Sequence, residues 1–216
     1  MKANIRGVIV PVLSLICAIS VAWAAPAKSA TLSRLAVIDP IIKEAIAAKE
    51  APGAVVLVGH NGQVVYRKAF GHRALEPRRE LMTLDTVFDM ASLTKVIATT
   101  TSVMQLVEQG KVKPNDPVDK YLPEFAQNGK EDITVRELLT HYSGLAPDLD
   151  LTQMWGGKAT AYNMAFSLKP DFPPGSRFVY SDINFITLGA LVERVSGESL
   201  DRYTLEHVFL PLEEFL

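Results

Sequence analysis

Ser92 and Lys95 are the two residues whose types and spacing first suggest a chemical function. They form a Ser-x-x-Lys tetrad at the start of an apolar segment with helical periodicity. Residues three apart on a helix share a face, with Cβ atoms about 5–6 Å apart, so the lysine amine can reach the serine hydroxyl. A serine needs an adjacent base to act as a nucleophile, and a neutral lysine can serve. Burial and the positive end of the helix dipole both lower a lysine pKa. The same helix end favours the negative charge that acyl transfer places on a carbonyl oxygen.

A tetrad of this kind also arises by chance, so its context has to support the interpretation. A short apolar run, residues 86–90, precedes the serine, and a helix follows it. A second element is the segment 173–182, in which a Pro-Pro-Gly turn leads into a short extended piece that reaches Tyr180. A phenol of pKa ~10 becomes a useful proton carrier beside a cation such as Lys95. Taken alone, Tyr180 is better explained as a half-buried aromatic residue with a satisfied hydroxyl.

Together these elements resemble the serine β-lactamase-related superfamily, in its branch of class C β-lactamases, esterases and D-Ala-D-Ala peptidases. The resemblance runs from about Leu35 to Leu212 and rests on four ordered landmarks, residues 88–95, 116–123, 138–145 and 173–180. It implies that Ser92 is the acylated nucleophile, that Lys95 is its base or proton shuttle, and that Tyr180 opens a Tyr-x-Asn-like motif. It also implies an α+β fold with an antiparallel sheet flanked by helices, and hydrolysis of a β-lactam, a D-alanyl peptide or a small ester.

Asp182 is a departure from that family, because it stands where the Tyr-x-Asn motif has its amide. We place Asp182 at the substrate, but an ionised carboxylate cannot donate a hydrogen bond as an amide does. It would add negative charge beside Lys95 and could raise that lysine's pKa. Asn184 comes two residues late, and on a helix it faces elsewhere. We hypothesise that the change shifts the substrate more than it abolishes activity, as in relatives with esterase-like character.

A third family motif, Lys-[Thr/Ser]-Gly or His-x-Gly, does not follow Tyr180 in this sequence. In the family it lies on a distant strand, lines the substrate and supplies the second oxyanion donor. The segment 210–216 begins like the family's Pro-Leu-Gly-Met and then diverges, as a frameshift or premature stop would make it. We therefore expect the C-terminal strands of the sheet to be missing. The alternative to an enzyme is an inactive fragment, or a non-catalytic protein that binds peptidoglycan-like ligands.

The elements that must position these residues follow from periodicity and turn residues. Apolar residues at helical spacing predict helices over residues 32–49, with Pro40 in the first turns, and 92–109, ended by Gly110. Asn61-Gly62 between β-rich runs predicts a hairpin of strands 54–59 and 63–70. Further helices are predicted over 134–140, 182–196 and 200–209. The segments 71–84, 111–125 and 147–174 are predicted to be a charged loop, an extended loop and an irregular region.

The N-terminal segment has the three parts of a secretory signal peptide. Lys2 and Arg6 precede an apolar run over residues 7–21, and Ala22-Trp23-Ala24 is a small-x-small cleavage site. A membrane anchor is the competing interpretation, but the run of about 15 residues is short of the ~20 that span a bilayer. We therefore predict a signal peptide over 1–24, a serine hydrolase domain over 25–216 in its N-terminal part only, and a secreted or periplasmic protein with no membrane span after cleavage. Cys17 would be removed, leaving no disulfide and no thiol nucleophile.

Composition excludes several other classes of protein. With 22 basic and 24 acidic residues, the net charge of −2 offers no basic excess for nucleic acid. Hydrophobic residues make up 48% of the chain, which is typical of a globular protein and not of a disordered chain or a coiled coil. The four histidines lack metal-ligand spacing, and no glycine-rich phosphate loop occurs, so we expect no metal and no cofactor. His141 is expected to be a hydrogen-bonded loop residue. The expected partner is a small-molecule or peptidoglycan-derived substrate.

Overall fold

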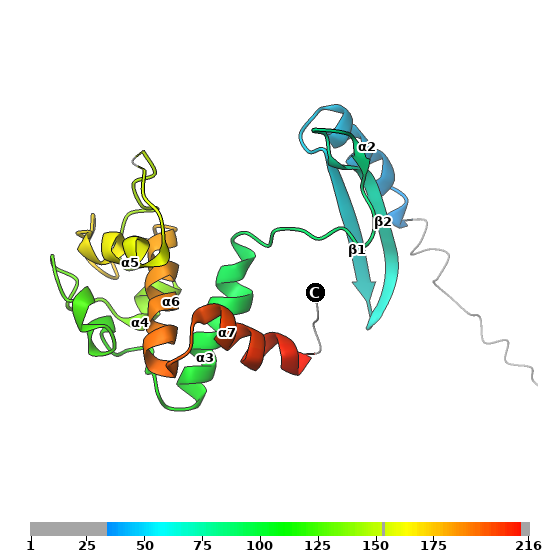
Figure 1. Ribbon diagram of the computed structural model, residues 1–216. Coiled ribbons are helices and arrows are strands. Elements are labelled where there is room, and N and C mark those ends of the chain that lie inside the picture. The colour runs from blue at the N-terminus through cyan, green and yellow to red at the C-terminus, as the bar shows by residue number, and fades with distance from the viewer. Residues whose placement is uncertain (1–33, 153, 213–216) are drawn as a thin grey trace, which may run out of the picture. The chain divides into compact units, whose positions relative to one another are not determined.

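The computed structural model describes residues 34–152 and 154–212 and divides between Phe88 and Asp89 into two compact units. The proposed signal peptide, residues 1–24, and the divergent residues 213–216 lie outside the described residues. The first unit carries a helix and a small antiparallel sheet, and the second is helical (Figure 1). The predicted α+β class with an antiparallel sheet and helices is confirmed.

In the first unit, the sheet is built on the predicted hairpin. Strands β1 (Gly53–His60) and β2 (Gln63–Ala74) pair antiparallel, and Asn61 and Gly62 form the turn with φ of 49° and 71°. Positive φ at both central residues suits the two-residue turn that matches strand twist, and it explains the Asn-Gly pair. Helix α2 (Ile38–Ala47) lies within the predicted 32–49 segment, with Pro40 in its first turn. It is tied to β2 by the Tyr66 hydroxyl, which donates to Asp39 at 2.7 Å.

The predicted charged loop 71–84 is wrong over part of its length. β2 continues to Ala74, and a third strand, β3 (Glu80–Leu81), pairs with it through His72 and Leu81 to give the order β1-β2-β3. Arg73 and Glu80 on these two strands form an ion pair at 3.0 Å. Opposite charges across neighbouring strands stabilise a pair of edge strands. Arg73 and Glu80, two of the charges that suggested a loop, therefore belong to the strand pairing, and residues 75–79 connect the two strands.

The second unit contains the predicted helices and several further elements. They are η1 (Lys95–Thr100), α3 (Thr101–Glu108), η2 (Val118–Lys120), η3 (Pro123–Phe125), α4 (Val135–Leu139), α5 (Lys158–Ser167), α6 (Asp182–Ser196), α7 (Leu200–Thr204), η4 (Leu205–Phe209) and η5 (Leu210–Leu212). Helix α6 has the predicted bounds, and α4 begins after Thr134 with a capping box formed with Glu137. The predicted extended loop 111–125 contains the two short 3₁₀ turns η2 and η3.

Three predictions in this unit need correction. The predicted helix 200–209 is α-helical only in α7, and its second half, η4, is π-helical. The predicted helix 92–109 is present, but its first part, η1, is π-helical, and only the second part, α3, is regular. The predicted irregular region 147–174 contains helix α5, whose sequence carries no apolar stripe of helical period. Two of its residues, Ala165 and Phe166, are nevertheless buried. Tertiary packing therefore holds α5 in place, which periodicity alone cannot reveal.

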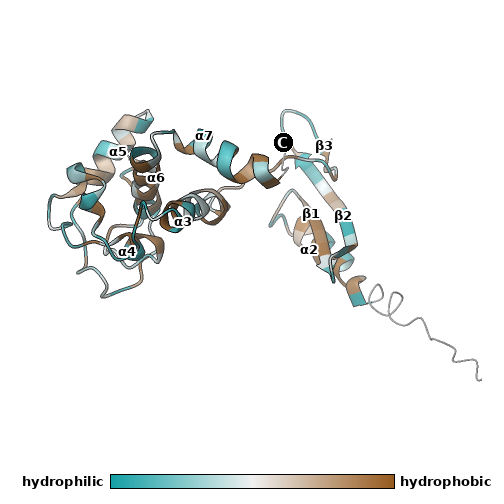
Figure 2. Ribbon diagram, turned by 90° about the horizontal axis from the view of Figure 1, so that it is seen from below, coloured by the Kyte–Doolittle hydropathy of each residue, from teal (hydrophilic) through white to brown (hydrophobic). Residues whose placement is uncertain are grey.

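The core of the second unit surrounds α6. Nine residues of α6 are buried, and Leu188 and Leu191 have no exposed surface. Figure 2 shows the helix as predominantly hydrophobic, with α3, α4 and α5 around it. Core residues from the other elements include Val103, Phe125 and Leu138, all fully buried. Because α6 begins two residues after Tyr180, this core fixes the position of the candidate site.

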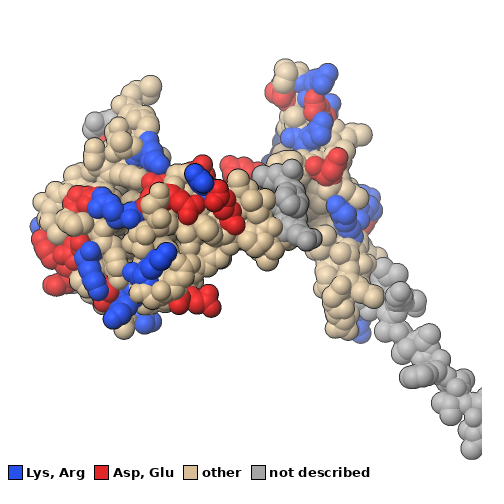
Figure 3. Space-filling model, turned by 60° about the horizontal axis from the view of Figure 1, so that its bottom comes forward, with Lys and Arg blue, Asp and Glu red and all other residues tan. Residues whose placement is uncertain are grey.

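The surface of the second unit mixes both signs of charge. On the face drawn in Figure 3, basic and acidic side chains are interspersed over the helices. Within residues 34–152 and 154–212, none of the helices combines the length and the apolarity that crossing a bilayer requires.

Candidate active site

Ser92 lies on a strained turn at the beginning of the helical segment that continues into η1. Ala91, directly before it, has a φ of 42°, in the left-handed region that residues other than glycine rarely adopt. The Asp89 carboxylate accepts a hydrogen bond from the Ala91 amide at 2.8 Å and so holds this turn. Backbone strain of this kind persists where the surroundings enforce it, and it is concentrated at functional sites. The serine itself is exposed.

Lys95 brings the site together, because its ammonium contacts the other three predicted residues. Its Nζ donates to Ser92 Oγ at 3.1 Å, lies 2.6 Å from Asp182 Oδ1, and sits 5.1 Å from the centre of the Tyr180 ring. Only 14% of the lysine side chain is exposed. All four residues predicted for the site, Ser92, Lys95, Tyr180 and Asp182, are therefore neighbours in the second unit.

The pKa of Lys95 is raised above its ordinary value. Burial lowers it, but hydrogen bonds and charges from Asp182 and Tyr180 more than offset the burial. Burial lowers this pKa, as expected, and the expected opposite effect of Asp182, together with that of Tyr180, outweighs it. Lys95 is an ammonium ion at neutral pH, which makes it a stabiliser of negative charge and not a ready proton acceptor.

Tyr180 has the opposite shift. Its pKa is lowered by the hydrogen bond with Ser92 and then by Lys95, while Asp182 acts weakly in the other direction. Both leading contacts stabilise a phenolate, so this side chain is the group at the site best placed to take a proton from the serine.

The segment that carries Tyr180 is held on both sides. Ser181 is the N-cap of α6, accepting a hydrogen bond from the Asn184 amide at 3.3 Å, and its hydroxyl donates to the Ala146 carbonyl at 2.6 Å. The Asp182 amide donates to the Pro147 carbonyl at 2.7 Å. Asn184 faces away from the site, as predicted: it is fully buried and accepts from the Ser143 hydroxyl at 2.6 Å.

His141 lies next to Tyr180, although the sequence predicts for it only the role of a hydrogen-bonded loop residue. Its Nδ1 accepts from the Ser181 amide at 3.0 Å, which confirms that expectation. Its ring also lies on the Tyr180 ring, with centres 4.5 Å apart. The signal that pointed here was its position in the 138–145 landmark, which sequence alone could not connect to Tyr180.

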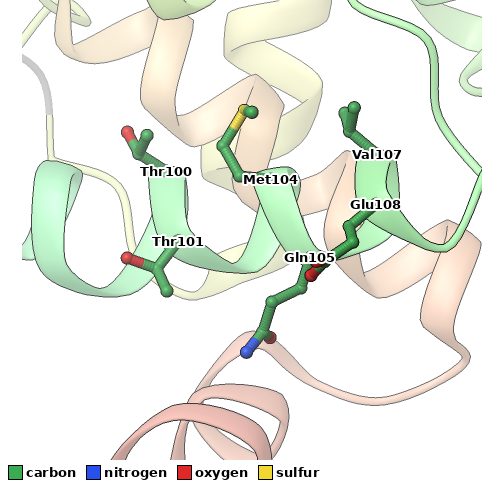
Figure 4. Close-up of a pocket in the computed structure, with 6 residues that line it drawn as sticks. All are labelled: Thr100, Thr101, Met104, Gln105, Val107 and Glu108. Atoms are coloured by element: carbon green, nitrogen blue, oxygen red, sulfur yellow. The ribbon is translucent and has the colours of Figure 1, made fainter.

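A hollow of about 440 Å³ opens beside the site. Lys95 and Asp182 lie on its wall, Asp148 and Lys158 add charge, and Tyr162 and Leu200 are among its apolar lining. A different hollow of about 480 Å³ lies further along the helix, around Thr100, Thr101, Met104, Gln105, Val107 and Glu108 (Figure 4). None of the four predicted site residues lines the hollow around Thr100 to Glu108. The hollow beside Lys95 and Asp182 is therefore the candidate substrate-binding region.

Only some of the apolar residues that predicted the helix over 92–109 are buried in the second unit. Val103 is fully buried, but Leu93 and Val96 are each more than half exposed, and Met104 is 47% exposed. Gln105 points from α3 towards the next helices in Figure 4 and donates to the His207 carbonyl at 2.8 Å.

One group of side chains in the described residues has the spacing of a metal site, formed by Glu198, Glu206 and His207. Arg202 lies between the two carboxylates, 2.9 Å from Glu206 and 3.9 Å from Glu198, and His207 contacts Glu198 at 3.1 Å. These ion pairs account for the cluster, which spans residues 198–207. It contributes nothing to the site around Ser92.

The fold is that of the class that contains β-lactamases and penicillin-binding proteins. The chain belongs to the Beta-lactamase family, whose model matches residues 38–214. It is 33% identical over 184 residues to a protein of Escherichia coli (strain K12) named "Putative D-alanyl-D-alanine carboxypeptidase", covering 74% of this chain and 42% of that protein.

Two solved structures share the fold. The octameric penicillin-binding protein homologue from Pyrococcus abyssi is 29% identical with a TM-score of 0.71, over 83% of this chain and 43% of that one. EstCE1, described as a hydrolase with promiscuous acyltransferase activity, is 27% identical with a TM-score of 0.70, over 85% and 53%. This chain thus spans about half the length, or less, of the proteins it matches.

Proposed function

We propose that the protein is a serine hydrolase in which Ser92 is acylated by an ester or amide and then released by water. The observation that carries the proposal is the contact of Lys95 Nζ with Ser92 Oγ at 3.1 Å, with Tyr180 completing the group. Membership of the Beta-lactamase family supports it, as do the names of the carboxypeptidase relative and of EstCE1.

The proposed first step is attack by Ser92 Oγ on the substrate carbonyl carbon. The serine proton passes to Tyr180, whose pKa is lowered by Ser92 and Lys95, and the ammonium of Lys95 stabilises the phenolate that receives it. The proton then goes to the leaving group as the bond between that group and the carbonyl carbon breaks. In the second step water attacks the carbonyl carbon of the acylated serine and gives a proton to the Tyr180 phenolate. Tyr180 returns this proton to Ser92 Oγ as the bond between the acyl group and the serine breaks.

The proposed substrates are a β-lactam, a D-alanyl peptide or a small ester. The name of the Escherichia coli relative favours a peptidoglycan-derived D-alanyl peptide, and the description of EstCE1 favours acyl transfer more broadly. Asp182, in place of an amide, presents a carboxylate near the substrate and disfavours an anionic group beside it. We also propose that residues 1–24 direct the chain to the periplasm or out of the cell.

Intact-mass labelling tests this function. The purified chain is treated separately with a fluorophosphonate, with a penicillin and with a D-alanyl-D-alanine peptide, and Ser92→Ala is the control. One adduct per chain that is absent in Ser92→Ala is the expected result, and the reagent that reacts fastest identifies the substrate class. A folded chain that gains no mass with any of the reagents contradicts the proposal.

A second candidate function is ligand binding without turnover. The observation that favours it is the carboxylate of Asp182 beside the site, because its charge raises the pKa of Tyr180 and so opposes the phenolate that would take the serine proton. A penicillin or peptide that raises the melting temperature of the chain without forming an adduct, both in the natural chain and in Ser92→Ala, is the outcome that this candidate predicts.

A further inference from the structure

We propose that His141 is a positioning residue for Tyr180, holding the phenol against Ser92 and Lys95 by gripping the backbone on both sides of it and stacking on its ring. The effect of this placement on catalysis rests on the proposed function. Its structural part, the placement of Tyr180, stands independently of whether the chain turns over a substrate.

The backbone contacts are the first observation. The His141 carbonyl accepts a hydrogen bond from the Val179 amide at 2.9 Å, and its ring Nδ1 accepts one from the Ser181 amide at 3.0 Å. A single residue thus holds the amides immediately before and after Tyr180. Two such hydrogen bonds fix the direction in which the intervening side chain leaves the backbone.

The ring contacts are the second observation. The His141 and Tyr180 rings are 4.5 Å apart at an angle of 32°, and Lys95 Nζ contacts the same phenol ring at 5.1 Å. The imidazole is itself held between aromatic neighbours, Phe178 at 5.8 Å and Phe185 at 5.2 Å. Phe185 belongs to α6, so the histidine links the Tyr180 segment to the core helix.

The backbone of His141 is the third observation. Its φ of 61° lies in the left-handed region, and its amide donates to the Leu138 carbonyl at the end of α4. Histidine and asparagine are among the few residues other than glycine that occur there. The conformation strains an ordinary side chain, so it is retained where the structure depends on it.

The protonation state of His141 suits this role. Burial and the charge of Lys95 lower its pKa, with Asp182 acting in the opposite direction, so the ring is neutral at neutral pH. Because Nδ1 accepts the Ser181 amide, the ring proton belongs on Nε2. Asn184 Nδ2 lies 3.4 Å from the same Nδ1 and is compatible with an unprotonated nitrogen.

The titration of Tyr180, followed by NMR of the chain labelled in its tyrosines, tests this inference without requiring turnover. Tyr180→Phe identifies the signal among the six tyrosines. In the natural chain, Tyr180 titrates below its ordinary value of 10.0 because of Ser92 and Lys95. In His141→Ala the phenol loses its placement, and its titration moves up towards that value. Labelling of Ser92 by a fluorophosphonate falls by about tenfold, less than the roughly 10²–10⁴-fold contribution of an acid–base group, because the phenol is misplaced and not removed.

Two further variants separate the two contacts. His141→Asn keeps an acceptor near the Ser181 amide and tolerates the positive φ, but loses the ring; His141→Phe keeps the ring and loses the acceptor. Each is expected to shift the Tyr180 titration by less than His141→Ala does. Tyr142→Leu, on the same loop, is the matched control and leaves the titration unchanged.

The inference is overturned if folded His141→Asn and His141→Phe both give the natural Tyr180 titration, whether or not His141→Ala folds. That result is distinct from failure of the proposed function, which is the absence of any Ser92 adduct in the natural chain. A titration that shifts in a chain without an adduct supports the positioning role and contradicts the hydrolase.

Discussion

Asp182 sets the charge on Lys95 and thereby the pH range in which Tyr180 can act. Reaction through a phenolate rises as the pH passes the pKa of Tyr180 and falls as Lys95 loses its proton at higher pH. Asp182 raises the pKa of Lys95 and also that of Tyr180. Asp182→Asn is therefore expected to move both limbs of the profile to lower pH. At pH 7, fluorophosphonate labelling should rise several-fold, because removing the carboxylate lowers the pKa of Tyr180 and leaves more of it as the phenolate.

The labelling rate measured from pH 5 to pH 11 by intact mass checks this prediction. Asp148→Asn is the control: this carboxylate lines the same hollow, while the ion pair of Lys95 is formed with Asp182. A profile that stays in place in Asp182→Asn, or that moves equally in Asp148→Asn, contradicts the assignment of the shift to Asp182.

Lys130 is a buried charge with a structural role. Its side chain has no exposed surface, and its ammonium donates to the carbonyls of Gln127, Phe166 and Leu168 at 2.6 to 2.8 Å. Lys130→Met keeps the volume but leaves three carbonyls without this donor. The free energy of unfolding should fall by about 3 kcal/mol, the usual consequence of leaving buried polar groups unpaired. Denaturant unfolding measures it, and a loss no larger than that of the exposed Lys169→Met would refute the role.

At the scale of the element, Gly144 holds two chain segments at a distance that no other residue permits. Its φ is 79°, and its carbonyl accepts the amides of Asp171 and Phe172. A Cβ at this position would lie 2.0 Å from the Phe172 carbonyl oxygen. Gly144→Ala is therefore expected to destabilise the chain by about 3 kcal/mol or more, from the left-handed backbone and the clash together.

Gly129 is the matched comparison, because its φ of 83° is similar and a Cβ there meets no atom within 4 Å. Gly129→Ala should cost only about 1–2 kcal/mol, the contribution of the left-handed backbone alone. Thermal and denaturant unfolding of the two variants measure the difference. Equal losses would mean that the loop around Gly144 moves aside at little cost.

The elements that the sequence predicted are those with local signals. The Asn61-Gly62 turn, the Thr134 cap and the apolar pattern of α6 each carry their own physical cause within a few residues. Helix α5 and strand β3 carry none, because α5 is held by packing and β3 by pairing with β2. The π-helical η1 also escapes prediction, since a pattern of apolar residues does not distinguish it from an α-helix.

The features of the candidate site also divide into those that the sequence could predict and those that only the structure shows. Ser92, Lys95 and Tyr180 could be selected by spacing and by the family resemblance, and they are found together. The direction of the Lys95 pKa could not, because it depends on the balance between burial and the distance to Asp182. The contact between His141 and Tyr180 joins residues 39 positions apart and becomes visible only in three dimensions.

At the scale of the whole molecule, the buried surface is distributed unequally between the two units. In the second unit a continuous core runs from Val103 to Tyr203 around α6. Among the described residues of the first unit, Phe70 alone is buried, and α2 has no buried residue. A small sheet needs a hydrophobic face or a packed helix to be stable in water. The second unit therefore supplies most of the stability of the chain.

Hydrogen exchange should reveal this inequality. Amides of α6 are expected to exchange only on global unfolding of the second unit, while those of β1 and β2 exchange through local opening at a lower free energy. Leu191→Ala removes fully buried atoms and should lower the protection of α3, α4 and α6 by about 3 kcal/mol. Leu191→Ala should leave the protection of β1 and β2 unchanged. Phe70→Ala should lower the protection of β1 and β2 and leave that of α3, α4 and α6 unchanged. If Leu191→Ala lowers the protection of both units equally, they unfold as one, and the stability cannot be assigned to the helical core alone.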